Sequence, residues 1–253
     1  MSCCLLEPDL VENDLIDVDL LAYDLNGTTL TTSVLKKIKM IHESYYWKKE
    51  LYSCFSSIAK FIYLKRRPEQ SFVKVEKSLM MGGYIIRKLN EAQKIPPNFL
   101  KKKSKIQLYK NTGSIVDYMN WHHIDRHYDL TKIHMEEKDW GFILNQLIHS
   151  YTLIYSFDSN DRPDGILINS DWTKKKSLYL LTFEEILTIF LTVSEGDITN
   201  ARLKKELIGK DSKGNPMLGE MKLIDATYSY PNGLNISKEI KKTLKGNIYK
   251  RQK

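Results

Sequence analysis

Two long stretches of the chain repeat apolar residues with the period of an α-helix, and only a short link separates them. The first covers residues 32–65 and the second residues 71–94. One apolar face at this spacing predicts a helix that buries that face. Lys48 is the one break in the face of the first stretch. Because Pro68 lies in a link of a few residues, we expect the two helices to pack antiparallel.

Adjacent glycines occupy the middle of the second predicted helix, at Gly82 and Gly83. Each glycine inside a helix costs about 1 kcal/mol relative to alanine. A compensating contact is therefore required, and we expect a neighbouring backbone to approach closely at this point.

The pattern changes after a third predicted helix over residues 136–149. Stretches rich in β-forming residues, separated by turn residues, predict three strands at 151–157, 165–169 and 178–181. Thr182 and Glu185 have the spacing of a capping box that opens another helix. A hairpin around residues 213–216 and a basic helix or tail from Ser237 follow, whereas residues 98–134 read as irregular. The order predicts an α+β fold: a helical N-terminal half with an antiparallel helix pair, packed with a small, mostly antiparallel β-meander.

Charge divides the chain unevenly. Residues 1–30 hold seven acidic residues and no lysine or arginine. The other 24 acidic residues face all 39 lysines and arginines, so residues 31–253 carry a formal net charge of +15. We expect an acidic head (1–30), a helical region (31–150) and a β-meander region with a basic tail (151–253), the last two forming one globular unit. The head is expected either to mask the basic body or to dock on a protein partner.

Composition narrows the classes of function. A basic chain favours nucleic acid or an anionic membrane surface as partner, although a lysine-rich solvated surface is the commoner cause of such a charge. Three cysteines are too few for a disulfide framework, and their number is odd. This cysteine content favours the cytoplasm as the location of the chain. No apolar run reaches the roughly 20 residues of a membrane span, so no membrane association is expected. No phosphate loop, nucleophile elbow, zinc-finger spacing or dinucleotide fingerprint is present, and we expect no cofactor.

Asn145 and His149 lie one helical turn apart near the end of the third predicted helix, so their side chains share a face. A neutral imidazole beside a polar group can transfer protons near pH 7. The stretch 144–149 and the preceding helix pair resemble the HEPN superfamily of helical ribonucleases, in which an arginine precedes the histidine by a few residues. The resemblance implies metal-independent RNA cleavage. Leu144 stands where the arginine is expected, and Arg87 on the second helix is the candidate to replace it; otherwise the site is inert. A helix-terminal histidine with a purely structural role is the alternative.

A basic and aromatic region follows the helix pair. We select Lys101, Lys102, Lys103, Lys105, Trp121, His123 and Arg126 as candidate nucleic-acid-binding residues, because lysines bind phosphates and rings stack on bases. The same composition suits a packed polar–aromatic corner. His123 and His127 have metal-ligand spacing, but no cysteine or His-Glu-x-x-His pattern accompanies them, and we expect no metal site.

Glu220-x-Lys222, with Asp211 before it and Glu185 upstream, has the residue types of an Mg²⁺-dependent nuclease. Glu-x-Lys recurs elsewhere in this lysine-rich chain, so coincidence is the working interpretation. Three functions are therefore carried forward. The first is a nucleic-acid-associated protein, an RNA-directed effector or degenerate HEPN-like ribonuclease, with a site at Arg87, Asn145 and His149. The second is a non-enzymatic interaction module that docks through its acidic head, and the third is the Mg²⁺-dependent nuclease.

Overall fold

The computed structural model describes residues 43–210, 212–231 and 233–251, and these residues form one compact unit. The acidic head, the first part of the helix predicted over 32–65, and Asp211 lie outside the described residues.

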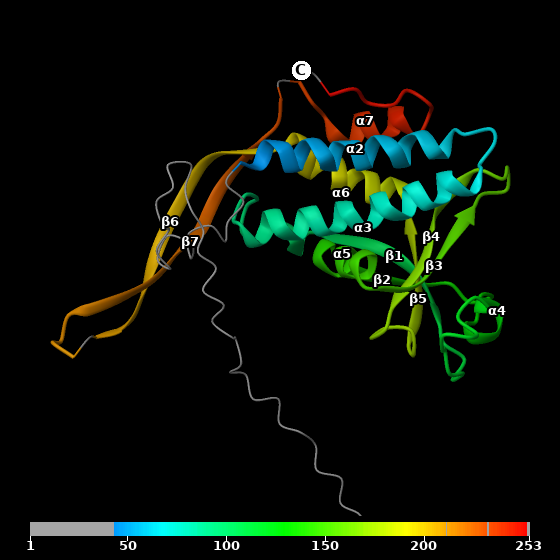
Figure 1. Ribbon diagram of the computed structural model, residues 1–253, viewed down its shortest axis with the longest axis horizontal. Helices are drawn as coiled ribbons and strands as arrows, with labels where there is room; N and C mark the ends of the chain where they lie inside the picture. Colours follow the sequence, from blue (N-terminus) through cyan, green and yellow to red (C-terminus); the bar gives the residue numbers. More distant parts are fainter. Residues whose placement is uncertain (1–42, 211, 232, 252–253) are drawn as a thin grey trace, which may run out of the picture. The chain divides into compact units, whose positions relative to one another are not determined.

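The predicted antiparallel helix pair is confirmed. Helices α2 (Ser44–Ile62) and α3 (Glu69–Glu91) run in opposite directions and pack along their length (Figure 1). Helix α6 (Phe183–Glu195) packs on α2, and α7 (Ile236–Thr243) packs on α6. Helix α5 (Trp140–Ile148) crosses α3. These helices bury one continuous apolar core with one face of a sheet.

That sheet is antiparallel, with strand order β2-β1-β5-β4-β3. Its strands are β1 (Lys103–Lys110), β2 (His134–Asp139), β3 (Ser150–Phe157), β4 (Pro163–Ser170) and β5 (Ser177–Thr182). The predicted meander is β3, β4 and β5, so the α+β class is confirmed. The interpretation of residues 98–134 as irregular was wrong for β1. The helix predicted from Glu136 begins at Trp140, because residues 134–139 instead pair with β1.

Different elements pack on the two faces of the sheet. Ile106, Leu108 and Leu181 project into the helical core. Leu178, on the opposite face, packs with Val116 and Tyr128 from the segment between β1 and β2, which also includes the short α4 (Ile124–His127). Both faces of the sheet are therefore covered at β4 and β5, which explains why these two strands are nearly continuous apolar runs.

The predicted hairpin exists and is much longer than the turn suggested. Strands β6 (Asp197–Lys210) and β7 (Pro216–Ser229) form a separate two-stranded sheet (Figure 1). An isolated ribbon of this kind is only marginally stable in water. The side chain of Gln93, just after α3, ties it to the body: its amide accepts from the Leu223 N–H and donates to the Met221 carbonyl.

The glycine pair lies where α3 meets two neighbours. A Cβ added at Gly82 would lie 2.2 Å from ring atoms of Phe190 on α6. One added at Gly83 would lie 3.5 Å from the Leu144 carbonyl oxygen of α5. The expected close approach is confirmed, by backbone at Gly83 and by an aromatic ring at Gly82. This contact compensates the low helix propensity of the two glycines.

Lys48, the break in the apolar face of α2, is buried with only 2% of its surface exposed. Its ammonium donates to the Gly196 carbonyl oxygen at 2.6 Å and to the Asp197 carboxylate. The start of β6 thus supplies the counter-charge and the hydrogen-bond acceptor that a buried ammonium needs.

We expect Asp197→Ala to lower the free energy of unfolding by about 2 kcal/mol, because it leaves the Lys48 ammonium buried with one carbonyl partner. The 68% exposure of the Asp197 side chain keeps this loss below that of a fully buried pair. Lys48→Met keeps the volume and removes the charge, so its cost should stay below about 1.5 kcal/mol. Urea unfolding followed by circular dichroism measures both. Equal losses for the two variants would mean that this ion pair does not stabilise the fold as described.

Candidate functional site

Arg87 and His149 meet across two helices. Arg87 lies on α3, and His149 is the C-cap of α5. The Arg87 Nη1 and His149 Nε2 atoms are 3.4 Å apart. Their approach follows from the glycine contact, because Gly83 lies one helical turn before Arg87 on the stripe that touches α5. The arginine selected from the sequence as the replacement for Leu144 therefore lies beside the histidine.

An acidic neighbour offsets part of this positive charge. The Glu91 carboxylate accepts from Lys88 Nζ at 2.7 Å and from Arg87 Nε at 3.0 Å. These two hydrogen bonds lower the pKa of Glu91 from its ordinary value, and the one from Lys88 has the larger effect. All three side chains are more than 40% exposed, so an incoming anion can compete with Glu91 for Arg87. Sequence reasoning missed Glu91, although its i,i+4 spacing from Arg87 is a readable signal.

Asn145 lies one turn before His149 on α5, on the same face. Its backbone carbonyl accepts the His149 N–H at 3.0 Å and so ends the helix. Its exposed side chain makes no hydrogen bond with any residue that the structure describes. The third residue selected from the sequence is therefore next to the Arg87–His149 pair and available to a ligand.

The Arg87–His149 contact constrains the ring geometrically. A guanidinium can only donate, so a hydrogen bond between Arg87 Nη1 and His149 Nε2 requires the tautomer in which Nε2 is the acceptor. An exposed imidazole, an arginine and an amide side chain can together hold an anion and accept a proton from a neighbouring hydroxyl.

The lysines selected for nucleic-acid binding are spread over two elements and are partly neutralised. Lys101 ends the 3-10 turn η2 (Phe99–Lys101), and Lys103 and Lys105 share one face of β1. Lys103 pairs with Glu137 of β2 at 3.6 Å. The Lys102 ammonium lies 4.2 Å from the ring centre of Phe99, and burial lowers its pKa. None is hydrogen-bonded or ion-paired to Arg87, Asn145 or His149 in the described part of the chain.

The histidine-rich segment forms a packed corner on the outer face of the sheet. Both ring nitrogens of His127 are engaged, Nδ1 with the Ser114 hydroxyl at 2.7 Å and Nε2 with the Asn120 carbonyl at 3.0 Å. Trp121 packs against the apolar cluster around Tyr128. Among the described residues, no group of three or more potential metal ligands comes together.

His123 and Arg126 lie at the edge of this corner. Burial lowers the pKa of His123, and the neighbouring His122 lowers it further by a smaller amount. Arg126 is exposed. Among the described residues, no hydrogen bond or ion pair connects this corner to the selected lysines or to the Arg87–His149 pair.

The residues considered for Mg²⁺ are dispersed. Glu220 and Lys222 lie exposed on β7, and Lys222 pairs with Glu206 of β6 at 3.0 Å. Glu185 is on α6, where its carboxylate accepts from the Ser104 hydroxyl and burial raises its pKa. Thr182 caps α6 by accepting the Glu185 N–H at 3.2 Å, so only half of the predicted capping box forms.

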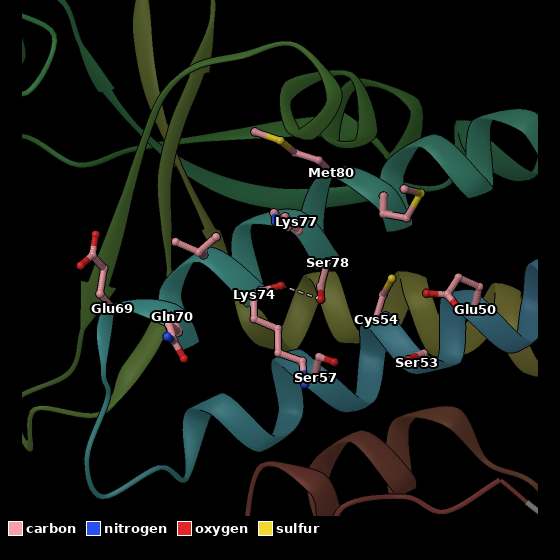
Figure 2. Close-up of a pocket in the computed structure, with 12 residues that line it drawn as sticks. Glu50, Ser53, Cys54, Ser57, Glu69, Gln70, Lys74, Lys77, Ser78 and Met80 are labelled. Atoms are coloured by element: carbon pink, nitrogen blue, oxygen red, sulfur yellow. Dashed lines mark hydrogen bonds between the residues drawn. The ribbon is translucent and has the colours of Figure 1, made fainter.

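A groove of about 840 Å³ lies between α2 and α3. Figure 2 shows Cys54 and Ser57 of α2 across from Lys74 and Ser78 of α3, where the Ser78 hydroxyl donates to the Lys74 carbonyl. Cys54 is buried at the edge of this groove. Burial, with a smaller effect of Glu50, raises the pKa of its thiol to about 11. The thiol is therefore neutral and not a nucleophile at ordinary pH.

We expect Cys54 to react with iodoacetamide at pH 8 roughly a hundred times more slowly in the folded chain than in urea, because the raised pKa depletes the thiolate. The variant C3S/C4S leaves Cys54 as the one thiol, and mass spectrometry follows its alkylation. Rapid alkylation of the folded variant would contradict the burial described.

None of the helices in the described part of the chain is both long and apolar enough to cross a bilayer. A scan against protein-family models, a search of curated proteins and a search of solved structures each gave no match to this chain. The site therefore rests on its own geometry.

Proposed function

We propose that this chain is a cytoplasmic RNA-directed effector that cleaves RNA without a metal ion, in the manner implied by its resemblance to HEPN ribonucleases. The observation that carries the proposal is the 3.4 Å contact between Arg87 and His149. It places a cation that can bind phosphate beside an imidazole that can accept a proton from a hydroxyl, on two helices that pack closely at Gly83. The net positive charge of residues 31–253 adds long-range attraction for a polyanion.

In the proposed reaction, a phosphate of a single RNA strand takes over the Arg87 guanidinium, which releases Nε2 of His149. His149 accepts the proton of the adjacent 2′-hydroxyl, and the 2′-oxygen bonds to phosphorus as the bond to the 5′-oxygen breaks. Water supplies a proton to the departing 5′-oxygen. Arg87 donates hydrogen bonds to the phosphate oxygens on which charge develops. Asn145 orients the nucleotide. The products are a 2′,3′-cyclic phosphate and a 5′-hydroxyl.

The test is cleavage of a labelled single-stranded RNA by the full chain in the presence of EDTA. His149→Ala should lower the rate by at least about 100-fold, because it removes the general base. His122→Ala is the matched control, since His122 is exposed and lies in the corner of the sheet. Equal activity of the two variants would eliminate His149 as the base, and loss of activity in EDTA would favour the Mg²⁺-dependent alternative.

The second candidate function is a non-enzymatic interaction module. It is favoured by the groove between α2 and α3, which presents Val73 and Met81, each more than 40% exposed, beside Lys74 and Lys77. This reading makes His149 a structural helix cap. It predicts that His149→Ala leaves every activity of the chain unchanged.

A further inference from the structure

A second cavity, of about 780 Å³, lies where α2, the end of α6 and the base of the β6–β7 hairpin meet. Three tyrosines, Tyr45, Tyr52 and Tyr230, line it together with the carboxylates of Glu195 and Asp197. Aromatic faces combined with carboxylates are the groups that proteins use to hold organic cations. The site described above uses none of these residues.

A guanidinium already occupies one wall of this cavity. The Cζ atom of Arg251 lies 5.4 Å from the ring centre of Tyr45, and its Nε lies 3.3 Å from Oε1 of Glu195. The backbone N–H of Arg251 donates to the Tyr52 hydroxyl at 3.1 Å, and Nη2 donates to the Ser194 carbonyl at 3.4 Å. The cavity therefore holds both the side chain of an arginine and the peptide N–H that belongs to it.

The fit of Arg251 is incomplete. Nη1 of Arg251 and Oε1 of Glu195 are buried, and neither makes a hydrogen bond. Buried polar atoms without a partner are costly, and a carboxylate can accept two parallel hydrogen bonds from one guanidinium. Glu195 is only 4% exposed, and burial raises its pKa. An arginine that entered from another direction could satisfy the carboxylate better than Arg251 does.

The other charges of the cavity single out Glu195 as the group that recognises the cation. Asp197 is already paired with the buried Lys48, so its charge is offset. Lys49 also lines the cavity and repels a second cation at its side of the opening. Glu195 has Arg251 as its ion-pair partner, and Tyr249 donates a hydrogen bond to its other oxygen at 3.3 Å.

We propose that this cavity binds an arginine side chain presented by a peptide segment of a partner protein, and that Arg251 occupies the site in the free chain. The guanidinium stacks on Tyr45 and pairs with Glu195, and the Tyr52 hydroxyl accepts the N–H of the incoming arginine. Displacement of Arg251 then exchanges an incomplete ion pair for a bidentate one. This inference does not depend on RNA cleavage.

The probes are two matched peptides, acetyl-Gly-Arg-Gly-amide and acetyl-Gly-Lys-Gly-amide, titrated calorimetrically into the full chain. We expect Arg251→Ala to bind the arginine peptide at least tenfold more tightly than the unsubstituted chain does, and at least tenfold more tightly than it binds the lysine peptide. The added substitution Glu195→Gln should abolish this preference. Equal binding of the two peptides, or no binding by a variant that melts like the unsubstituted chain, would overturn the proposal.

A second measurement tests the proposal on the unsubstituted chain and so remains valid if the Arg251→Ala variant does not fold. In the unsubstituted chain, millimolar arginine peptide should shift the side-chain Nε–H resonance of Arg251 in a ¹⁵N spectrum, whereas the lysine peptide should not. Arg251→Lys serves to assign the resonance by its disappearance. An Arg251 resonance that is unmoved by the arginine peptide would also contradict the proposal.

Discussion

Arg87→Ala is expected to slow RNA cleavage by about 100-fold to 1000-fold, the usual loss when one donor to a developing anionic charge is removed. Arg87 and His149 act on the same step of the proposed reaction, so the double variant R87A/H149A should lose little more than either single variant. Initial rates on a labelled single-stranded RNA in EDTA measure all three. Losses that multiply in the double variant would mean that the residues act independently.

The Glu91→Gln variant is a control for this prediction, because it should strengthen the interaction of Arg87 with RNA. Its carboxylate holds both Arg87 and Lys88 in the free chain. Glu91→Gln removes the competing charge, so affinity for RNA at low salt should rise about threefold. The gain should vanish in the R87A background if Arg87 is the group that Glu91 restrains. Weaker RNA binding by Glu91→Gln would show that the carboxylate supports the site.

Gly82→Ala is expected to lower the free energy of unfolding by at least about 2 kcal/mol, because overpacking a dense core outweighs the gain in helix propensity. The added Cβ would lie 2.2 Å from the Phe190 ring, and both residues are buried. Urea unfolding monitored by circular dichroism measures the change. Separation of α3 from α6 at this point is the physical cause of the loss.

The neighbouring glycine is the matched control. A Cβ at Gly83 would lie 3.2 Å from Cγ1 of Ile148, which can shift by a few tenths of an ångström. Gly83→Ala should therefore cost much less than Gly82→Ala. In a Phe190→Leu background the smaller side chain leaves room, so Gly82→Ala should cost at least about 1 kcal/mol less than in the unsubstituted chain. An unchanged cost in that background would contradict the contact described.

The helix pair and the meander were predictable because their signals are local. A 3.6-residue period and the turn residues between short β-rich stretches depend on neighbours in sequence. Strands β1 and β2 were missed because lysines and glutamates occupy many of their exposed positions, as at Lys103, Lys105 and Glu137. These residues have low β-propensity, and their pairing becomes visible only when the two strands are aligned.

The candidate site was predictable in part for the same reason. The turn between Asn145 and His149 is local, so their shared face followed from the sequence. Arg87 reaches His149 only because α3 and α5 cross. The glycine pair predicted a close contact on α3, but the sequence did not indicate which helix would make it. The Glu195–Arg251 pair joins residues 56 positions apart, and no sequence pattern marked it. Lys48 was visible as a break in an apolar face, but Asp197 was not visible as its partner.

The measurement that tests the central claim most directly is the chemistry of the RNA ends after incubation with the full chain in EDTA. The account predicts fragments with a 2′,3′-cyclic phosphate and a 5′-hydroxyl, and none with the His149→Ala variant. Intact RNA, or fragments with a 5′-phosphate that form only when Mg²⁺ is present, would contradict it.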